Sequence, residues 1–262
     1  MRNRTIFSCC IAALLFQGAW SQTPPKPAAP KPYDQVITQT AKSSPGIFTI
    51  HRVDEKLYYE IPKNQLNKDF LMVVQIAKGR LGTGNGGGDP IDERVVRWTL
   101  RDNKVLLVDV DYRAWADPSL PIARAVAAAN NPTYLAAFPL EAKGKADSSV
   151  IDVTKLFTTE VLEFSPKNYI GAKALDKDRC FLENALAFPE NIEVESTLTL
   201  MNPDRVMGWG GGKLSQGTAS LRMRYSMVKL PDQPMMPRLQ DSRVGYFAHG
   251  QRDFGRPEHY AK

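Results

Sequence analysis

The sequence predicts a mainly β or α+β fold: an antiparallel sheet or sandwich with two or three short helices. Two observations support this prediction. Roughly seven segments alternate apolar and polar residues or form short apolar runs, as strands do, whereas only two or three short segments have helical spacing. No fixed-period repeat is visible, and a hydrophobic content of 43% suffices for a packed core.

Residues 1–21 have the pattern of a signal peptide. Arg2 and Arg4 precede a short apolar run at residues 6–16, and Ala19-Trp20-Ser21 fits a small-residue cleavage site. The run is shorter than the roughly 20 residues that a membrane-spanning helix needs, so we expect no transmembrane segment after cleavage. We therefore expect export to the periplasm, the outer surface or the medium. The alternative is that residues 1–21 are not cleaved and remain as a membrane anchor.

Residues 22–32 are rich in proline and predict an extended linker. Residues 33–80 are expected to form a small strand-rich domain that opens with a short amphipathic helix, because apolar residues recur there at helical spacing. These residues are Tyr33, Val36, Ile37 and Ala41.

Two strand predictions complete this first domain. Residues 46–62 (GIFTIHRVDEKLYYEIP) alternate with period two on either side of Asp54-Glu55, which predicts a strand pair and its turn. Residues 69–78 contain the apolar run FLMVVQIA, which predicts a central strand buried on both faces.

Residues 81–230 are expected to form a β-rich accessory domain. Alternation in residues 94–100 and 104–112, around Arg101-Asp102-Asn103, predicts a hairpin. Residues 121–130 predict one short helix, with Pro121 in its first turn and its apolar face formed by Ile122, Ala125, Val126 and Ala129.

The last clear strands are predicted at residues 191–200 and 218–229. A glycine-rich loop at residues 208–212 links them. The proline-rich residues 231–262 predict a connector.

Two glycine motifs resemble nucleotide-binding loops without meeting their requirements. Gly82, Gly84 and Gly87 have the G-x-G-x-x-G spacing, but a strand follows them instead of the helix start that would bind a pyrophosphate. In the second motif, Leu214 stands where a phosphate loop has the magnesium-binding hydroxyl after Lys213. Both motifs predict loops.

The histidines do not predict a metal site. His51, His249 and His259 are the three available, and none belongs to an HExxH helix, in which two histidines one turn apart converge on zinc. We interpret His51 as a packing or hydrogen-bonding residue of its strand. The chain also lacks a G-x-S-x-G nucleophile elbow.

Cys180 is the one cysteine outside the signal peptide, so no disulfide is expected within the mature chain. Without a nearby histidine to activate it, we interpret Cys180 as a small, partly buried apolar residue. A weaker alternative is a thiolate that caps a zinc ion of a partner.

The number and distribution of charged residues argue against nucleic-acid binding. Removal of Arg2 and Arg4 leaves 32 basic against 28 acidic residues, so the formal net charge falls from +6 to +4, and the basic residues are scattered.

Asp109 and Asp111 lie on one strand face and suit a calcium site or an acid–base pair, but a hydrated strand face is the simpler interpretation.

Paired charges predict that two strands are neighbours. Glu193 and Glu195 lie on one face of their strand, and Arg222 and Arg224 lie on one face of theirs. This spacing suits cross-strand ion pairs. We interpret it as sheet register, not as catalysis.

Several of these segments resemble a known family. Residues 46–62, 69–79 (DFLMVVQIAKG), 189–200 (PENIEVESTLTL) and 241–247 (DSRVGYF) resemble, in the same order, the amino-terminal region of secreted bacterial zinc-dependent metalloproteases. In that family, two adjacent domains of unknown function precede a metzincin-like protease domain with an extended HExxH motif. The resemblance implies that zinc and the catalytic residues belong to that protease domain, the partner in cis.

The chain ends at Lys262, before such a protease domain would begin, so the resemblance assigns no catalytic, cofactor-binding or metal residue here. We expect a fragment; a stand-alone copy is the alternative. The expected function is that of an exported accessory or pro-segment-like region, itself non-catalytic. The alternative is an independent periplasmic or surface β-sandwich module that binds peptide or carbohydrate, and an enzyme with an unrecognised site comes third.

Overall fold

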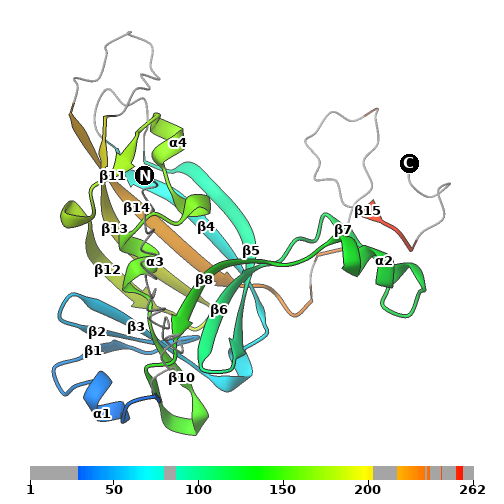
Figure 1. The fold of residues 1–262 in the computed structure, drawn as a ribbon, viewed down its shortest axis with the longest axis horizontal. Helices are drawn as coiled ribbons and strands as arrows, with labels where there is room; N and C mark the ends of the chain where they lie inside the picture. Colours follow the sequence, from blue (N-terminus) through cyan, green and yellow to red (C-terminus); the bar gives the residue numbers. More distant parts are fainter. Residues whose placement is uncertain are drawn as a thin grey trace, which may run out of the picture.

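The computed structural model describes residues 29–79, 87–202, 217–233, 235–236, 243 and 252–255. Within this part of the chain, the predicted mainly β fold is confirmed: two antiparallel sheets pack against each other, and a small third sheet stands apart (Figure 1).

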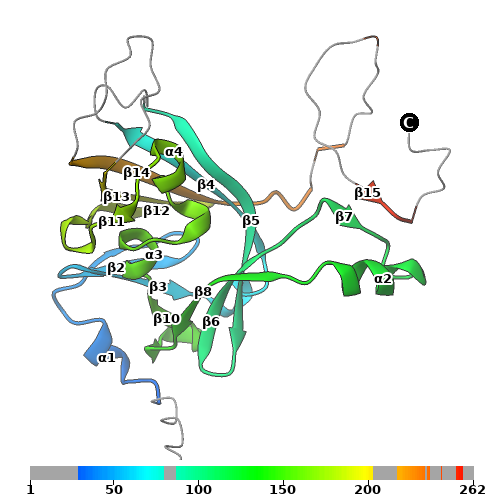
Figure 2. The ribbon, with the colours of Figure 1, turned by 45° about the horizontal axis from the view of Figure 1, so that its top comes forward.

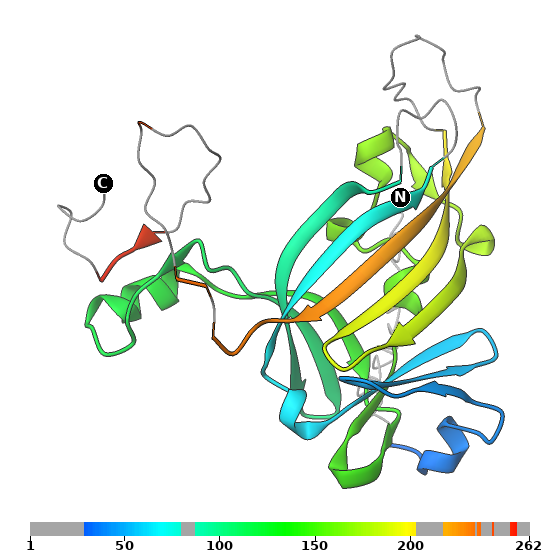
Figure 3. The same ribbon diagram turned by 180° about the vertical axis from the view of Figure 1, so that it is seen from behind.

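The larger sheet has eight strands in the order β11-β13-β14-β4-β5-β6-β8, with β12 also paired to β13. It curls strongly, as the view from behind shows (Figure 3). Its strands are β4 (Asp69–Lys78), β5 (Asp89–Arg101), β6 (Lys104–Asp109), β8 (Thr133–Pro139), β11 (Ala174–Leu175), β12 (Phe181–Ala187), β13 (Asn191–Met201) and β14 (Thr218–Lys229).

The smaller sheet has five strands in the order β1-β2-β3-β10-β9. They are β1 (Lys42–Ser44), β2 (Thr49–Val53), β3 (Lys56–Ile61), β9 (Ala142–Lys143) and β10 (Ser149–Asp152). The turn at Asp54-Glu55 joins β2 to β3, and Asp54 has a positive φ of 52°, which aspartate tolerates better than most residues. The predicted strand pair is confirmed.

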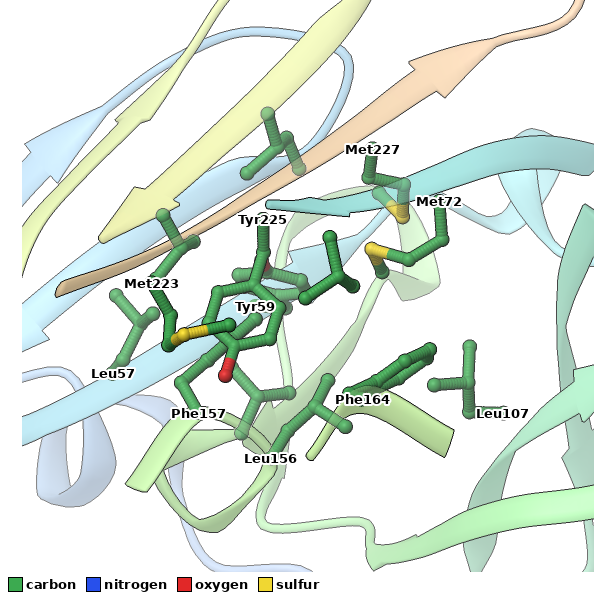
Figure 4. Packing of buried hydrophobic residues seen from close by; sticks show 14 of the residues in the cluster. Leu57, Tyr59, Met72, Leu107, Leu156, Phe157, Phe164, Met223, Tyr225 and Met227 are labelled. Atoms are coloured by element: carbon green, nitrogen blue, oxygen red, sulfur yellow. The ribbon is translucent and has the colours of Figure 1, made fainter. Parts of the chain in front are cut away.

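One apolar core lies between the two sheets. Phe48 and Tyr59 from the small-sheet segment meet Trp98 of β5 at ring-centroid distances of 6.4 and 5.9 Å. Short helices close the open side of the curled sheet: α3 (Thr154–Thr158), the 3-10 turn η3 (Leu162–Phe164) and α4 (Lys167–Ile170). Phe157 of α3 and Phe164 of η3 pack against Tyr225 in this core (Figure 4).

Strand β4 has the predicted central place but not the predicted double burial. It lies between β14 and β5, yet its residues alternate between fully and partly buried. The fully buried ones are Phe70, Met72, Val74 and Ile76. The prediction of two buried faces was wrong because the short helices cover only the inner face of this antiparallel sheet, as antiparallel sheets permit.

β4 also joins the two parts of the chain. It belongs to the region expected as a small first domain, but both of its partner strands come from the region after residue 80. Arg52 of β2 adds a second connection, because its guanidinium donates to the backbone oxygens of Glu183 (2.8 Å) and Leu182 (2.9 Å) on β12. The two parts therefore share one sheet and one core.

The first helix is shorter than its spacing predicts. Only α1 (Tyr33–Val36) is helical, and the chain then turns into β1. β-branched residues, which lose side-chain freedom in a helix, stand at the end of α1 and just after it: Val36, Ile37, Thr38 and Thr40. α1 still covers the outer face of the small sheet, where Val36 and Ile37 pack with Tyr58.

The predicted hairpin of β5 and β6 is confirmed, but β6 ends at Asp109 and the chain then leaves the sheet. It forms an arm that consists of β7 (Ala114–Trp115), α2 (Ile122–Ala129) and β15 (Arg252–Asp253) and that stands away from both sheets (Figures 1 and 2). The helix predicted at residues 121–130 is confirmed as α2. None of its residues is buried.

Substitution of Trp98 tests whether the two sheets share one core. This residue is fully buried, and its Nε1–H donates to Sδ of Met227 at 3.2 Å. Trp98→Ala should lower the free energy of unfolding by about 3–5 kcal/mol, because it removes a large side chain and leaves a cavity. Trp115→Ala is the matched control: Trp115 is 38% exposed, and its loss should cost no more than about 0.5 kcal/mol. Equal losses in urea unfolding would contradict this assignment of the core.

Candidate functional site

The arm carries an apolar groove. It has a volume of about 730 Å³ and lies between the apolar face of α2, Ala114 of β7 and Phe254. The four α2 residues that the sequence placed on one face line it: Ile122, Ala125, Val126 and Ala129. Phe254 and Ile122 are 49% and 40% exposed, so the groove is open to solvent.

Hydrogen bonds to the backbone hold the groove together. The N–H of Arg252 donates to the oxygen of Arg113 (2.8 Å), and the N–H of Phe254 donates to the oxygen of Trp115 (3.0 Å), which places β15 parallel to β7. At the other end, Nδ2 of Asn130 donates to the backbone oxygen of Asp111 (2.9 Å). The arm is thus a structured unit that brings together residues far apart along the chain.

Asp109 and Asp111 do not form the calcium or acid–base site considered from the sequence. Asp109 accepts from Arg94 at 2.6 Å, and Asp111 accepts from Arg113 at 2.9–3.0 Å. Those hydrogen bonds from Arg113 hold the pKa of Asp111 below its usual range. The two carboxylates are paired with different guanidinium groups, and they do not share a strand face, because β6 ends at Asp109 and Asp111 lies beyond it. In the described residues, no group of three or more His, Cys, Asp or Glu side chains is placed to hold a metal ion.

The paired charges on β13 and β14 lie next to each other, as their spacing predicts. Glu193 meets Arg224 at 3.0 Å, while Arg222 lies 3.9 Å from Glu195 and 2.9 Å from Glu183 of β12. They lie beside a shallow depression of about 300 Å³ on the outer face of the sheet. Its lining is Asn184, Leu186, Phe188, Asn191, Glu193, Glu195 and Arg224.

His51 belongs to a buried polar network that the sequence alone did not reveal. The residue is 4% exposed, and its ring lies between Ser43 and Glu60: Nδ1 is 2.7 Å from Oγ of Ser43, and Nε2 is 3.0 Å from Oε2 of Glu60. Glu60 also accepts from Tyr33 (2.9 Å) and Ser148 (2.5 Å). The predicted hydrogen-bonding role of His51 is confirmed. The hairpin register, which pairs His51 with Tyr58, was the available signal, because it puts Glu60 one diagonal step away.

The network shifts two pKa values. Burial alone would raise the pKa of Glu60, but hydrogen bonds from Ser148, Tyr33 and His51 outweigh it and lower this pKa below its ordinary value. Burial and the bond to Glu60 raise the pKa of Tyr33 to about 12. Gly144 leaves the necessary space, since a Cβ there would collide with Oε1 of Glu60. Glu60 is therefore an ionised acceptor at neutral pH.

Cys180 has the environment of an inert thiol. It is partly buried, its Sγ donates to the oxygen of Asp176 at 3.1 Å, and burial raises its pKa. A raised pKa disfavours the thiolate that zinc binding requires. The structure therefore favours the interpretation as an apolar residue.

Other candidates considered from the sequence lie outside the described residues. These are Gly82, Gly84, the loop at 208–212 with Lys213 and Leu214, His249 and His259. Gly87 and Gly88 form the turn into β5, so a strand follows the first glycine motif, as predicted. Across the described ranges, no helix is long and apolar enough to span a membrane.

Glu60 gives a pH-dependent prediction. Because its pKa is lower in the folded state, ionised Glu60 stabilises the fold fully above its unfolded pKa of about 4.3, and this contribution is lost as the pH falls through the folded value. At pH 7, Glu60→Gln should therefore lower the free energy of unfolding by about 2 kcal/mol. The difference from the unsubstituted protein should narrow below about pH 4. Urea unfolding at several pH values measures both the loss of stability at pH 7 and its narrowing at low pH.

Glu55→Gln is the matched control, because Glu55 lies exposed in the turn of the same hairpin. Its effect should be small at every pH. A Glu60→Gln effect that stays constant from pH 7 to pH 3 would contradict a stabilising carboxylate.

The cross-strand ion pair gives a second prediction. Glu193→Arg should destabilise the sheet by up to about 1 kcal/mol, because it places two positive charges together, and adding Arg224→Glu should recover part of that loss. Thermal melts at low and high salt measure the coupling, which salt should weaken. No recovery in the double variant would exclude the pairing.

Comparisons with known proteins give two family matches. Residues 30–79 match a domain of unknown function (DUF5118), and residues 88–262 match a second one (DUF5117). No curated protein and no solved structure matches the chain. Because the second match covers well over half of its length, the chain belongs to the family described as domain of unknown function DUF5117.

Proposed function

We propose that this region is the accessory, pro-segment-like part of an exported bacterial zinc-dependent metalloprotease. The resemblance of residues 46–62 and 69–79 to the amino-terminal region of such proteases supports the family, and the pattern of residues 1–21 supports export. Zinc and the residues that cleave peptide bonds then belong to a protease domain in cis. This region folds, docks or restrains that domain and cleaves no peptide bond itself.

The apolar groove on the arm carries the proposal. A short helix with an apolar face normally buries that face, but all of α2 remains at least partly exposed here. The groove has the anatomy of a docking surface: an apolar floor that includes Val126, an exposed aromatic ring in Phe254, and a charged rim that includes Arg113 and Arg252. The arm also contains residues 252–255, which belong to the carboxyl-terminal part of the chain.

The depression on the outer face of β12 to β14 favours a second candidate function, a binding module for peptide or carbohydrate. Amide and charged side chains surround Phe188, which is 41% exposed, and an exposed ring amid hydrogen-bonding groups suits a sugar face. The two candidates use different surfaces. Substitutions can therefore separate them.

Val126→Asp tests the docking groove. In the parent protein with its protease domain, the substitution should reduce the association of the two parts at least about tenfold, because it places a charge on the apolar floor. Two measurements follow this association: the rate at which limited proteolysis cuts the connector predicted at residues 231–262, and the yield of active protease. Arg124→Glu is the control, since it changes charge on the same helix outside the groove lining. Equal behaviour of the two variants would contradict docking through the groove.

The gene provides a direct observation. An in-frame HExxH motif downstream of the codon for Lys262 would support the metalloprotease proposal, and a stop codon there would favour the independent binding module. Purified alone, residues 22–262 should contain no stoichiometric zinc and should not cleave casein. Casein cleavage that a chelator abolishes would contradict the proposed division of labour.

A further inference from the structure

A serine, a histidine and a glutamate form a continuous hydrogen-bonded chain in the small sheet. Ser43 of β1, His51 of β2 and Glu60 of β3 come from three adjacent strands, and the bonds measure 2.7 and 3.0 Å. Antiparallel register fixes the first contact, because Ser43 and His51 are directly opposite each other. The three side chains have the order of a nucleophile, a base and the acid that orients the base.

The hydrogen-bond partners of His51 indicate which of its ring nitrogens carries a proton. Glu60 has a lowered pKa and is ionised, so it only accepts hydrogen bonds. Nε2 of His51 must then carry the proton that it donates to Glu60, and in the neutral ring Nδ1 has the lone pair. When the ring is neutral, Oγ–H of Ser43 therefore donates to Nδ1, which is the direction needed for deprotonation. Relative to the best-known triads, the two ring nitrogens are exchanged.

Burial separates the roles of the three residues. The side chains of His51 and Glu60 are 5% and 12% exposed, while Ser43 is exposed at the edge of the sheet. A base in a low-dielectric site with an exposed serine is the arrangement that nucleophilic catalysis requires.

The neighbouring serine, Ser44, has different hydrogen-bond partners. Oγ of Ser44 lies 3.1 Å from the N–H of Ala187, from which it accepts, and 3.4 Å from the oxygen of the same residue. This hydroxyl connects β1 to the end of β12, and its hydrogen bonds are to backbone groups instead of a base. Ser44 is therefore a matched structural control on the same strand.

We propose that Ser43 is a nucleophile for acyl transfer from small carboxylic esters. Oγ bonds to the ester carbon as its proton moves to Nδ1 of His51, and Glu60 stabilises the imidazolium. The tetrahedral intermediate expels the alcohol, which takes the proton from Nδ1 and leaves an acyl-serine. Water then adds to the acyl carbon, gives its proton to Nδ1, and releases the carboxylic acid as Ser43 regains its proton. Because Ser43 lies on an open strand edge, the acyl group must be small or extended.

The experiment treats the purified chain with p-nitrophenyl acetate and follows p-nitrophenolate release, with peptide mapping by mass spectrometry. We expect an initial burst of p-nitrophenolate and an acetyl group on Ser43. Ser43→Ala should abolish both, and Ser44→Ala should retain both. Glu60 acts through His51 and is a positioning residue: Glu60→Gln should lower kcat by about 100-fold with KM unchanged, as loss of acid–base assistance does.

Three outcomes would overturn the proposal. The first is acetylation of lysines or the amino terminus without any on Ser43. The second is a full burst in Ser43→Ala. The third is an unchanged rate in His51→Gln when that variant melts as the unsubstituted protein does. None of these outcomes depends on a protease partner, so failure here would leave the docking proposal intact.

Discussion

The aromatic contacts between the two sheets are the constraint on which the rest of the structure depends. Phe48, in the turn before β2, meets Phe70 of β4 at 5.5 Å and Tyr59 of β3 at 5.9 Å, both edge to face. Trp98 then links these rings to Phe138 of β8. Because these rings come from the start, the middle and the far edge of the fold, neither sheet has a complete inner face without the other. The curled larger sheet holds both this cluster and the apolar residues of the short helices on its inner face.

Much of this fold could be predicted from the sequence, and the failures have physical causes. Period-two alternation identified the β2–β3 and β5–β6 hairpins, and the paired charges identified β13 and β14 as neighbours. The apolar run at 69–78 predicted a central strand correctly and its burial incorrectly, since apolar residues such as Leu71 and Val73 also occur on a half-covered face. Periodicity also cannot fix the length of a helix, which is why the helix that begins at Tyr33 was expected to be longer than one turn.

The candidate sites were less predictable because they depend on contacts distant in sequence. Helical spacing correctly placed four apolar residues on one face of α2, but nothing in that pattern said that the face would remain open and meet Phe254. Likewise, the sequence around His51 named no partner for it. Its environment arises from hairpin register together with Tyr33 and Ser148, which lie 27 and 88 residues from Glu60 in the chain. The local hairpin pattern could indicate that Glu60 lies near His51, but it carries no information about Tyr33 and Ser148.

The central position of β4 has a consequence for how the two family segments can exist. DUF5118 ends within one residue of this strand, and DUF5117 supplies both strands beside it. A polypeptide that carried residues 88–262 alone would have β14 and β5 as two new unpaired edges over an uncovered apolar cluster, which is the surface from which strand-to-strand aggregation starts. The first segment alone would keep the three paired strands β1, β2 and β3, together with β4, a long and largely apolar strand that would have no partner. The two segments therefore complete one folding unit, and a gene rearrangement that separated them would expose apolar surface on both.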